Sequence, residues 1–143
     1  MLNVMLREHN EARDEVGVEP MELDDDLSEQ ALAYAEELAA SGLFEHSASS
    51  DRPGQGENLW AGTASAFSFE QMADGWISEK QYYIHDNFPY VSNTGNWQDV
   101  GHYTQIIWRN TTQLGCGIAT GQNRDVLVCR YAPPGNVIGQ RAY

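Results

Sequence analysis

The stretch LGCGIATGQNRDVLVCRY, residues 114–131, decides the fold class of this chain. It contains two short apolar runs, 114–120 and 126–131, joined by the polar segment GQNRD. Short apolar runs bounded by turn residues are typical of buried strands, and the brief polar connection favours an antiparallel pair. Each run carries one cysteine, Cys116 or Cys129, so pairing would bring the two thiols close together. The residues alone leave open a disulfide or two free buried thiols.

Helical periodicity dominates the chain before these strands. Apolar residues recur at helical spacing in residues 2–16 and 27–41, and a glycine follows each segment as a stop signal. Asp26, with Glu29 three residues later, predicts the N-cap and capping box of the second helix. A third helix is predicted over residues 67–83, where apolar residues again recur at helical spacing.

A fourth helix is predicted to begin near Val100 and to contain Ile107 and Trp108. Residues 42–65 and 84–100 are rich in Gly, Ser, Asn and other polar residues, and are predicted loops. Helices therefore come first and paired antiparallel strands last, which indicates an α+β fold rather than alternating βαβ units. With 143 residues and no repeat or linker, the chain is expected to form one domain over residues 1–143.

The tail after the strands, PPGNVIGQRAY, is predicted to be an ordered closure of the domain. Pro133 and Pro134 lack backbone donors and should end the strand. Gly135 should permit a tight turn, after which Val137 and Ile138 can pack back on the body.

The formal charge of −13 lies in the first half of the chain. Residues 1–71 carry sixteen Asp and Glu against three Arg, whereas residues 72–143 carry five of each sign. Such a surface argues against nucleic acid as a partner, because no basic patch exists to replace phosphate counterions. No apolar run approaches the length of a transmembrane segment. The chain opens directly into a helical pattern, and we interpret any export signal as already removed.

Four histidines are available for chemistry: His9, His46, His85 and His102. Imidazole and carboxylate are the usual ligands of zinc and similar ions, but the chain has no HExxH motif and no paired-cysteine spacing. Taken singly, each histidine is more simply a structural residue. Ser47 directly follows His46, but no GxSxG motif accompanies it, and we interpret it as a loop or capping serine.

Two long motifs in the sequence are specific enough to indicate a resemblance to a known protein family. GHYTQIIWRNT (101–111) and VLVCRYAPPGNVIGQ (126–140) resemble the two signatures of the CAP superfamily, also called SCP or PR-1-like. Five shorter blocks match the same family in the same order, namely HNEAR, AYAEELAASG, FEHS, GENLW and WISEK. The resemblance covers nearly the whole chain.

The resemblance implies an α-β-α sandwich with a small antiparallel sheet between helical layers. It implies a secreted protein in which Cys116 and Cys129 form a disulfide. It also implies a cleft with two His and two Glu, which correspond motif by motif to His46, Glu57, Glu79 and His102. In related proteins the two His bind zinc or another divalent metal ion, so His46 and His102 are the expected metal ligands here.

Four further motif residues are expected to form cleft walls or to support the site: Asn58, Tyr103, Gln105 and Trp108. Gln105 in particular is expected to orient an imidazole through a hydrogen bond, as residues behind metal ligands commonly do. His9 and Arg13 stand four residues apart on the first helix and are interpreted as structural.

The function that follows is a secreted binding module whose cleft holds a divalent metal ion or a small ligand. Some relatives bind lipids, and four apolar residues before the first signature supply apolar surface that lipid binding, core packing or loop anchoring would explain equally well: Phe88, Tyr90, Val91 and Trp97. The alternative is a metal-assisted hydrolase or peptidase in which Glu57 or Glu79 serves as the general base.

Overall fold

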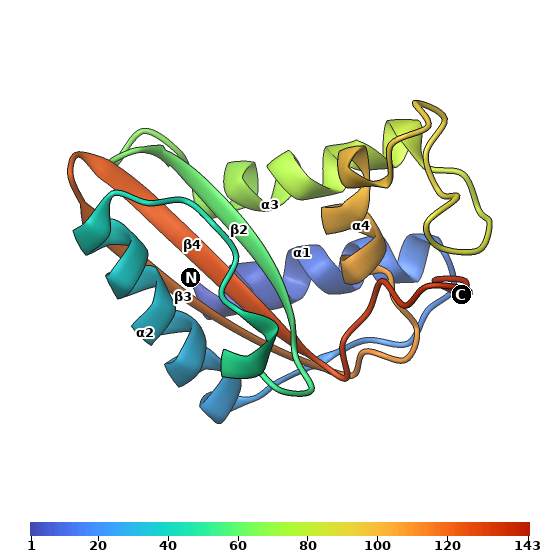
Figure 1. Cartoon of the computed structure of the whole chain (residues 1–143), viewed down its shortest axis with the longest axis horizontal. Coiled ribbons are helices and arrows are strands. Elements are labelled where there is room, and N and C mark those ends of the chain that lie inside the picture. Colours follow the sequence, from blue (N-terminus) through green and yellow to red (C-terminus); the bar gives the residue numbers. More distant parts are fainter.

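The computed structural model describes residues 1–143 and places a four-stranded sheet between two helical layers (Figure 1). Helix α2 (Asp25–Ser41) packs on one face of the sheet. Helices α1 (Leu2–Glu15), α3 (Phe69–Ile77) and α4 (Gly101–Ile106) lie on the other face. The predicted α+β sandwich is confirmed.

The sheet has the strand order β1-β3-β4-β2. Its centre is the predicted hairpin, formed by β3 (Gln113–Gly121) and β4 (Arg124–Ala132). The turn between them is shorter than the GQNRD segment, because only Gln122 and Asn123 connect the strands, with φ angles of 52° and 64°. Cys116 lies directly opposite Cys129 in the antiparallel register, and the two form a disulfide.

The other two strands were not predicted. Strand β2 (Gly56–Thr63) lies inside the segment predicted as loop, and it pairs antiparallel with β4 along its whole length. Its first four residues are all buried, so it lacks the alternation of a half-exposed strand, and its Gly and Asn suggest a loop. Strand β1 (Glu22–Leu23) pairs parallel with β3, so the sheet is mixed rather than purely antiparallel.

The predicted N-cap of α2 is wrong by two residues. The helix begins at Asp25, and the Asp24 side chain accepts a hydrogen bond from the Leu27 amide at 2.9 Å. Three consecutive aspartates offer equivalent caps in the sequence. The backbone amide of Asp24 also donates to the Leu114 carbonyl, and this bond to strand β3 fixes where the helix can start.

The third and fourth helices are both shorter than predicted. Ser68 caps α3 through a capping box with Gln71, and after Ile77 the chain tightens into a 3₁₀ turn, η2 (Ser78–Tyr82). Helix α4 ends at Ile106, so Ile107 and Trp108 lie beyond it. The buried Arg13 guanidinium explains this end, because it donates to the carbonyls of Ile106 and Trp108 at 3.0 and 2.9 Å.

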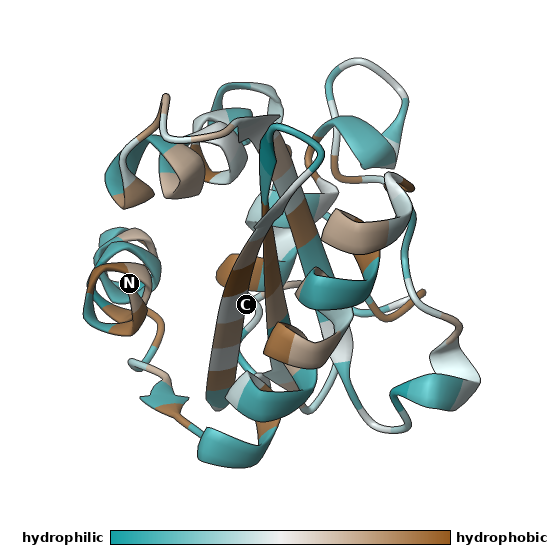
Figure 2. Cartoon of the chain, turned by 90° about the vertical axis from the view of Figure 1, so that its left-hand side faces the viewer, coloured by the Kyte–Doolittle hydropathy of each residue, from teal (hydrophilic) through white to brown (hydrophobic).

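Each face of the sheet has its own apolar core, and Figure 2 shows hydrophobic residues concentrated along the strands between the helical layers. Helix α2 approaches β3 so closely that a Cβ on Gly115 or Gly117 would lie within 2.4 Å of helix backbone or side-chain atoms. Alternation along β3 then turns Cys116 to the opposite face. The disulfide is therefore buried in the larger core, beneath α1, α3 and α4.

The C-terminal segment is ordered against the body, but not through the residues we predicted. Ile138 is 80% exposed and Val137 is 36% exposed, whereas Ala142 is buried. Backbone hydrogen bonds join this segment to residues 88 and 109, and the Tyr143 ring stacks on His85 at 4.2 Å. No helix has both the length and the apolar character needed to span a membrane.

Candidate functional site

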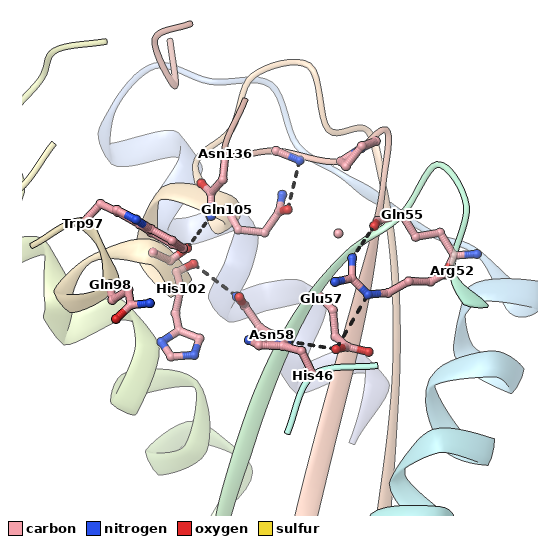
Figure 3. Close-up of a pocket in the computed structure, with 14 residues that line it drawn as sticks. His46, Arg52, Gln55, Glu57, Asn58, Trp97, Gln98, His102, Gln105 and Asn136 are labelled. Atoms are coloured by element: carbon pink, nitrogen blue, oxygen red, sulfur yellow. Dashed lines mark hydrogen bonds and ion pairs between the residues drawn. The ribbon is translucent and has the colours of Figure 1, made fainter. Parts of the chain in front are cut away.

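A cleft of about 410 Å³ opens where the start of β2, helix α4 and the segment after β4 meet (Figure 3). Only one of its 14 lining residues has a hydrophobic side chain. The lining residues are His46, Arg52, Gln55, Gly56, Glu57, Asn58, Trp97, Gln98, Gly101, His102, Gln105, Pro134, Gly135 and Asn136. These residues come from three segments distant in sequence, so the cleft exists only in the folded chain.

One imidazole in the cleft belongs to His46, which lies on the loop between α2 and β2. Its Nδ1 atom is 2.9 Å from Oε1 of Glu57, on strand β2. The His46 side chain is 55% exposed, whereas the Glu57 side chain is fully buried. A buried carboxylate on a strand therefore holds an exposed ring on a loop.

Glu57 is saturated with hydrogen bonds. Besides His46, it accepts from the Ser47 amide at 2.9 Å, the Ser47 hydroxyl at 2.7 Å and Nε of Arg130 at 2.8 Å. Burial by itself would raise the pKa of Glu57, but the hydrogen bonds from His46 and Ser47 and the charge of Arg130 hold that pKa below its ordinary value. Glu57 is therefore an ionised anchor.

The second imidazole, that of His102, is held in the same way. Its Nδ1 atom lies 2.7 Å from Oε2 of Glu79. The other oxygen of Glu79 accepts from the backbone amides of His102 and Tyr103, both at 3.1 Å. Trp76 stacks on the His102 ring, with the ring centroids 5.9 Å apart and the planes inclined by 18°. Glu79 and Trp76 together fix both the position and the tilt of this ring.

These contacts define the tautomer of both rings. A carboxylate only accepts hydrogen bonds, so each Nδ1 donates, and Nε2 of the neutral ring then presents a lone pair. Neither Nε2 atom has a hydrogen-bond partner in the protein. In Figure 3 the two rings point toward one another across the floor of the cleft. Two imidazole nitrogens without a partner in the protein therefore line one cleft.

The sequence profile of the family described as "CAP: Cysteine-rich secretory protein family" matches residues 6–131. The chain belongs to the CAP family. It is 44% identical to pathogenesis-related protein 1C of Nicotiana tabacum over 138 residues, which covers 94% of this chain and 76% of the relative. It is 36% identical to the human Golgi-associated plant pathogenesis-related protein 1, with 96% and 86% covered.

Solved structures agree with this assignment. The crystal structure of NaASP2 with Zn²⁺ superposes on this CAP domain with a TM-score of 0.83 and 26% identity, covering 99% of this chain and 83% of that one. A structure of MpPR-1i, at 21% identity and a TM-score of 0.61, shares the fold.

The four residues expected to support the CAP cleft have different roles in the structure. Asn58 lines the cleft, and its amide donates to the His102 carbonyl and to the Tyr131 hydroxyl, each at 3.1 Å. Gln105 also lines the cleft, but the expectation that it orients an imidazole is wrong. Its amide donates to the Thr111 hydroxyl at 3.1 Å, and its carbonyl accepts from the Gly135 amide at 3.0 Å. Gln105 thus ties α4 to the tail.

Tyr103 and Trp108 do not line the CAP cleft. Both side chains are buried in the larger core, with exposed fractions of 3% and 1%. Helical spacing turns Tyr103 inward while the preceding His102 faces the cleft. Glu79 is absent from the lining as well, because it stands behind His102.

The main contribution that sequence reasoning missed is Arg130. It is only 4% exposed and joins Glu57, Gln55 and Ser47 from strand β4. A signal was present, because an arginine inside the apolar run VLVCRYA needs a buried partner. Ser47 is likewise more than a loop serine, since its hydroxyl donates to Glu57.

The donor set of this CAP cleft fits a metal ion with few protein ligands. No group of three or more His, Cys, Asp or Glu side chains is placed to hold an ion. The two Nε2 atoms remain as donors, and each ring is supported through Nδ1 by a carboxylate, the arrangement found behind many metal-ligating histidines. An ion held by two nitrogens keeps open positions for water or another ligand.

Proposed function

We propose that this CAP domain is a secreted protein whose cleft binds a divalent metal ion, zinc in the first instance, through Nε2 of His46 and His102. The observation that carries the proposal is that each ring places Nδ1 against a carboxylate and leaves Nε2 without a protein partner, and that both rings line one cleft. Glu57 and Glu79 would orient the rings without touching the ion. When bound, the ion would supply open coordination positions for an oxygen or nitrogen ligand.

Two further observations support this function. The crystal structure of NaASP2 contains Zn²⁺, and that chain is 26% identical to this one. Export is supported by the Cys116–Cys129 disulfide, since disulfides persist in oxidising compartments, and by the secretory description of the family.

The alternative functions have weaker support. A hydrolase would need a carboxylate free to act as general base, yet every oxygen of Glu57 and Glu79 already accepts a hydrogen bond. Lipid binding was suggested by four apolar residues, of which Phe88 and Val91 are buried in the core. The other two, Tyr90 and Trp97, are exposed, and Trp97 is the one hydrophobic residue of the cleft lining.

Isothermal titration of metal-free protein with zinc tests the proposal. Wild type should bind one ion, and the double substitution His46→Ala/His102→Ala should abolish that binding. His85→Ala is the matched control, because His85 lies on a loop outside the cleft and should not affect binding. Equal affinity in the double variant, with circular dichroism showing an intact fold, would contradict the proposal.

A second variant tests the supporting role of the carboxylates. Glu79→Gln keeps the size of the side chain but removes its charge, and we expect zinc affinity to fall roughly 10- to 100-fold, as for other residues behind metal ligands. Unchanged affinity would show that Glu79 does not support the ligand ring.

A further inference from the structure

One wall of the cleft carries a cation with spare hydrogen-bonding capacity. Arg52 lies on the loop before β2, and Figure 3 shows its guanidinium extending into the cleft. Its Nε donates to the Ser47 hydroxyl at 3.0 Å, and its Nη1 donates to the Gln55 carbonyl at 2.8 Å. Its Nη2 has no hydrogen-bond partner in the protein. Bracing the loop therefore uses two of the three nitrogens and leaves the third for a ligand.

Arg52 forms an ion pair with Glu57 alone, and it shares that carboxylate with Arg130. Glu57 lies 3.8 Å from Nε of Arg52, but it is fully buried and already paired with Arg130 at 2.8 Å. Among the lining residues, Arg52 and Glu57 are the two with permanent charges. A solute entering the cleft thus meets a positive guanidinium edge, in a protein whose formal net charge is −13.

We propose that the cleft binds a small carboxylate ligand, with one carboxylate oxygen accepting from Arg52 and the carboxylate also neutralising the metal ion. This inference rests on the metal site proposed above. A guanidinium matches the planar shape of a carboxylate, and hydrogen bonds between the two charged groups are among the stronger ones in proteins. The open positions left by a two-histidine ion provide the second point of attachment. The metal and Arg52 would then select an anion that neither the acidic surface nor a neutral cleft would attract.

The experiment measures whether a carboxylate and zinc bind cooperatively. Zinc is titrated into metal-free protein in chloride and in acetate at equal ionic strength, with correction for zinc–acetate complexes. Acetate should tighten zinc binding to wild type by about 5-fold, a modest factor because Arg52 is partly exposed to solvent. Arg52→Gln should lose this gain, whereas Arg52→Lys, which keeps the charge, should retain part of it.

Two comparisons separate this role from others. Arg7→Gln removes the same charge from the exposed surface of α1 and should keep the full acetate effect. The quantity compared is the ratio of zinc affinity in acetate to zinc affinity in chloride within each variant, because a loss of loop bracing or of charge alone would change both affinities by the same factor. Phosphate replaces acetate in a parallel titration, and a larger gain with phosphate would overturn the assignment of a carboxylate.

The possible failures are distinguishable. If wild type binds zinc but acetate has no effect, or if Arg52→Gln keeps the effect, the carboxylate inference is wrong and the metal site stands. If wild type binds no zinc in either buffer, the metal proposal itself fails and this inference falls with it.

Discussion

Asn58 donates its side-chain amide to the backbone carbonyl of His102, 3.1 Å away, and so joins strand β2 to the helix that carries the second imidazole. The same amide reaches the buried hydroxyl of Tyr131 at 3.1 Å, and that hydroxyl lies 2.7 Å from Nε2 of His9. Nδ1 of His9 must donate to the Met5 carbonyl, so Nε2 accepts from Tyr131. A buried chain of hydrogen bonds therefore runs from α1 to the wall of the cleft.

Tyr131→Phe should break this chain at its centre. The loss of one hydroxyl leaves buried groups on His9 and Asn58 without their partner, and we expect the free energy of unfolding to fall by about 1–3 kcal/mol. Urea denaturation measures this effect. Tyr83→Phe is the control, because its buried hydroxyl has no partner and its removal should be neutral or stabilising. Equal costs in both variants would show that the chain contributes nothing specific.

The buried His9 in this hydrogen-bond chain also predicts that stability depends on pH. Burial lowers the pKa of His9 to about 4, from an ordinary value of 6.5. In the unfolded chain His9 becomes protonated near pH 6.5, whereas in the native state it stays neutral until about pH 4. The stability that neutral His9 contributes is complete above pH 6.5 and is lost as the pH falls toward 4, by about 1.4 kcal/mol per pH unit.

Urea unfolding of metal-free protein at several pH values measures this slope. His9→Gln should flatten it, and His85→Gln, at an exposed position, should not. EDTA is included so that proton competition at the proposed metal site does not contribute. A slope that persists unchanged in His9→Gln would assign the acid sensitivity to another group.

Removal of the disulfide should destabilise the domain. Cys116 and Cys129 are separated by 13 residues, and the loop-entropy argument gives a loss of roughly 3 kcal/mol for Cys116→Ala/Cys129→Ala. Chemical denaturation of the variant against oxidised wild type measures the loss, and mass spectrometry of unreduced peptides checks the bond itself. Two cysteines that alkylate freely in native oxidised protein would refute the pairing.

Deletion of residues 139–143 should destabilise the protein, although the deletion keeps the exposed apolar residues Val137 and Ile138. The deletion removes buried Ala142 and the backbone bonds to Phe88 and Arg109, and we expect a cost of at least about 2 kcal/mol. Ile138→Ser, at a position that is 80% exposed, should change stability by less than about 0.5 kcal/mol. The reverse order of the two thermal shifts would mean that Ile138 anchors the tail.

The hairpin, the first helix and the end of α2 could be predicted because their signals are local. Apolar runs flanking a polar turn, a 3.6-residue period and a glycine after a helix act within a few residues of chain. Strand β2 could not be predicted in this way, since GENLWAGT becomes a strand through eight pairings with β4, more than sixty residues later. Similarly, the N-cap of α2 depends on a bond from Asp24 to Leu114.

The sequence by itself determined the α+β class and the family resemblance, and through that resemblance it predicted the disulfide and the two His and two Glu. Only the tertiary structure decided which hydrogen-bond partner each of these side chains has. It pairs His46 with Glu57 and His102 with Glu79, assigns Gln105 to the tail, and reveals Arg52 in the cleft wall and Arg130 buried against Glu57. The physical reason is that a residue's type limits the bonds it can form. The partner it finds depends on distances between segments that meet only when the sheet and helices pack.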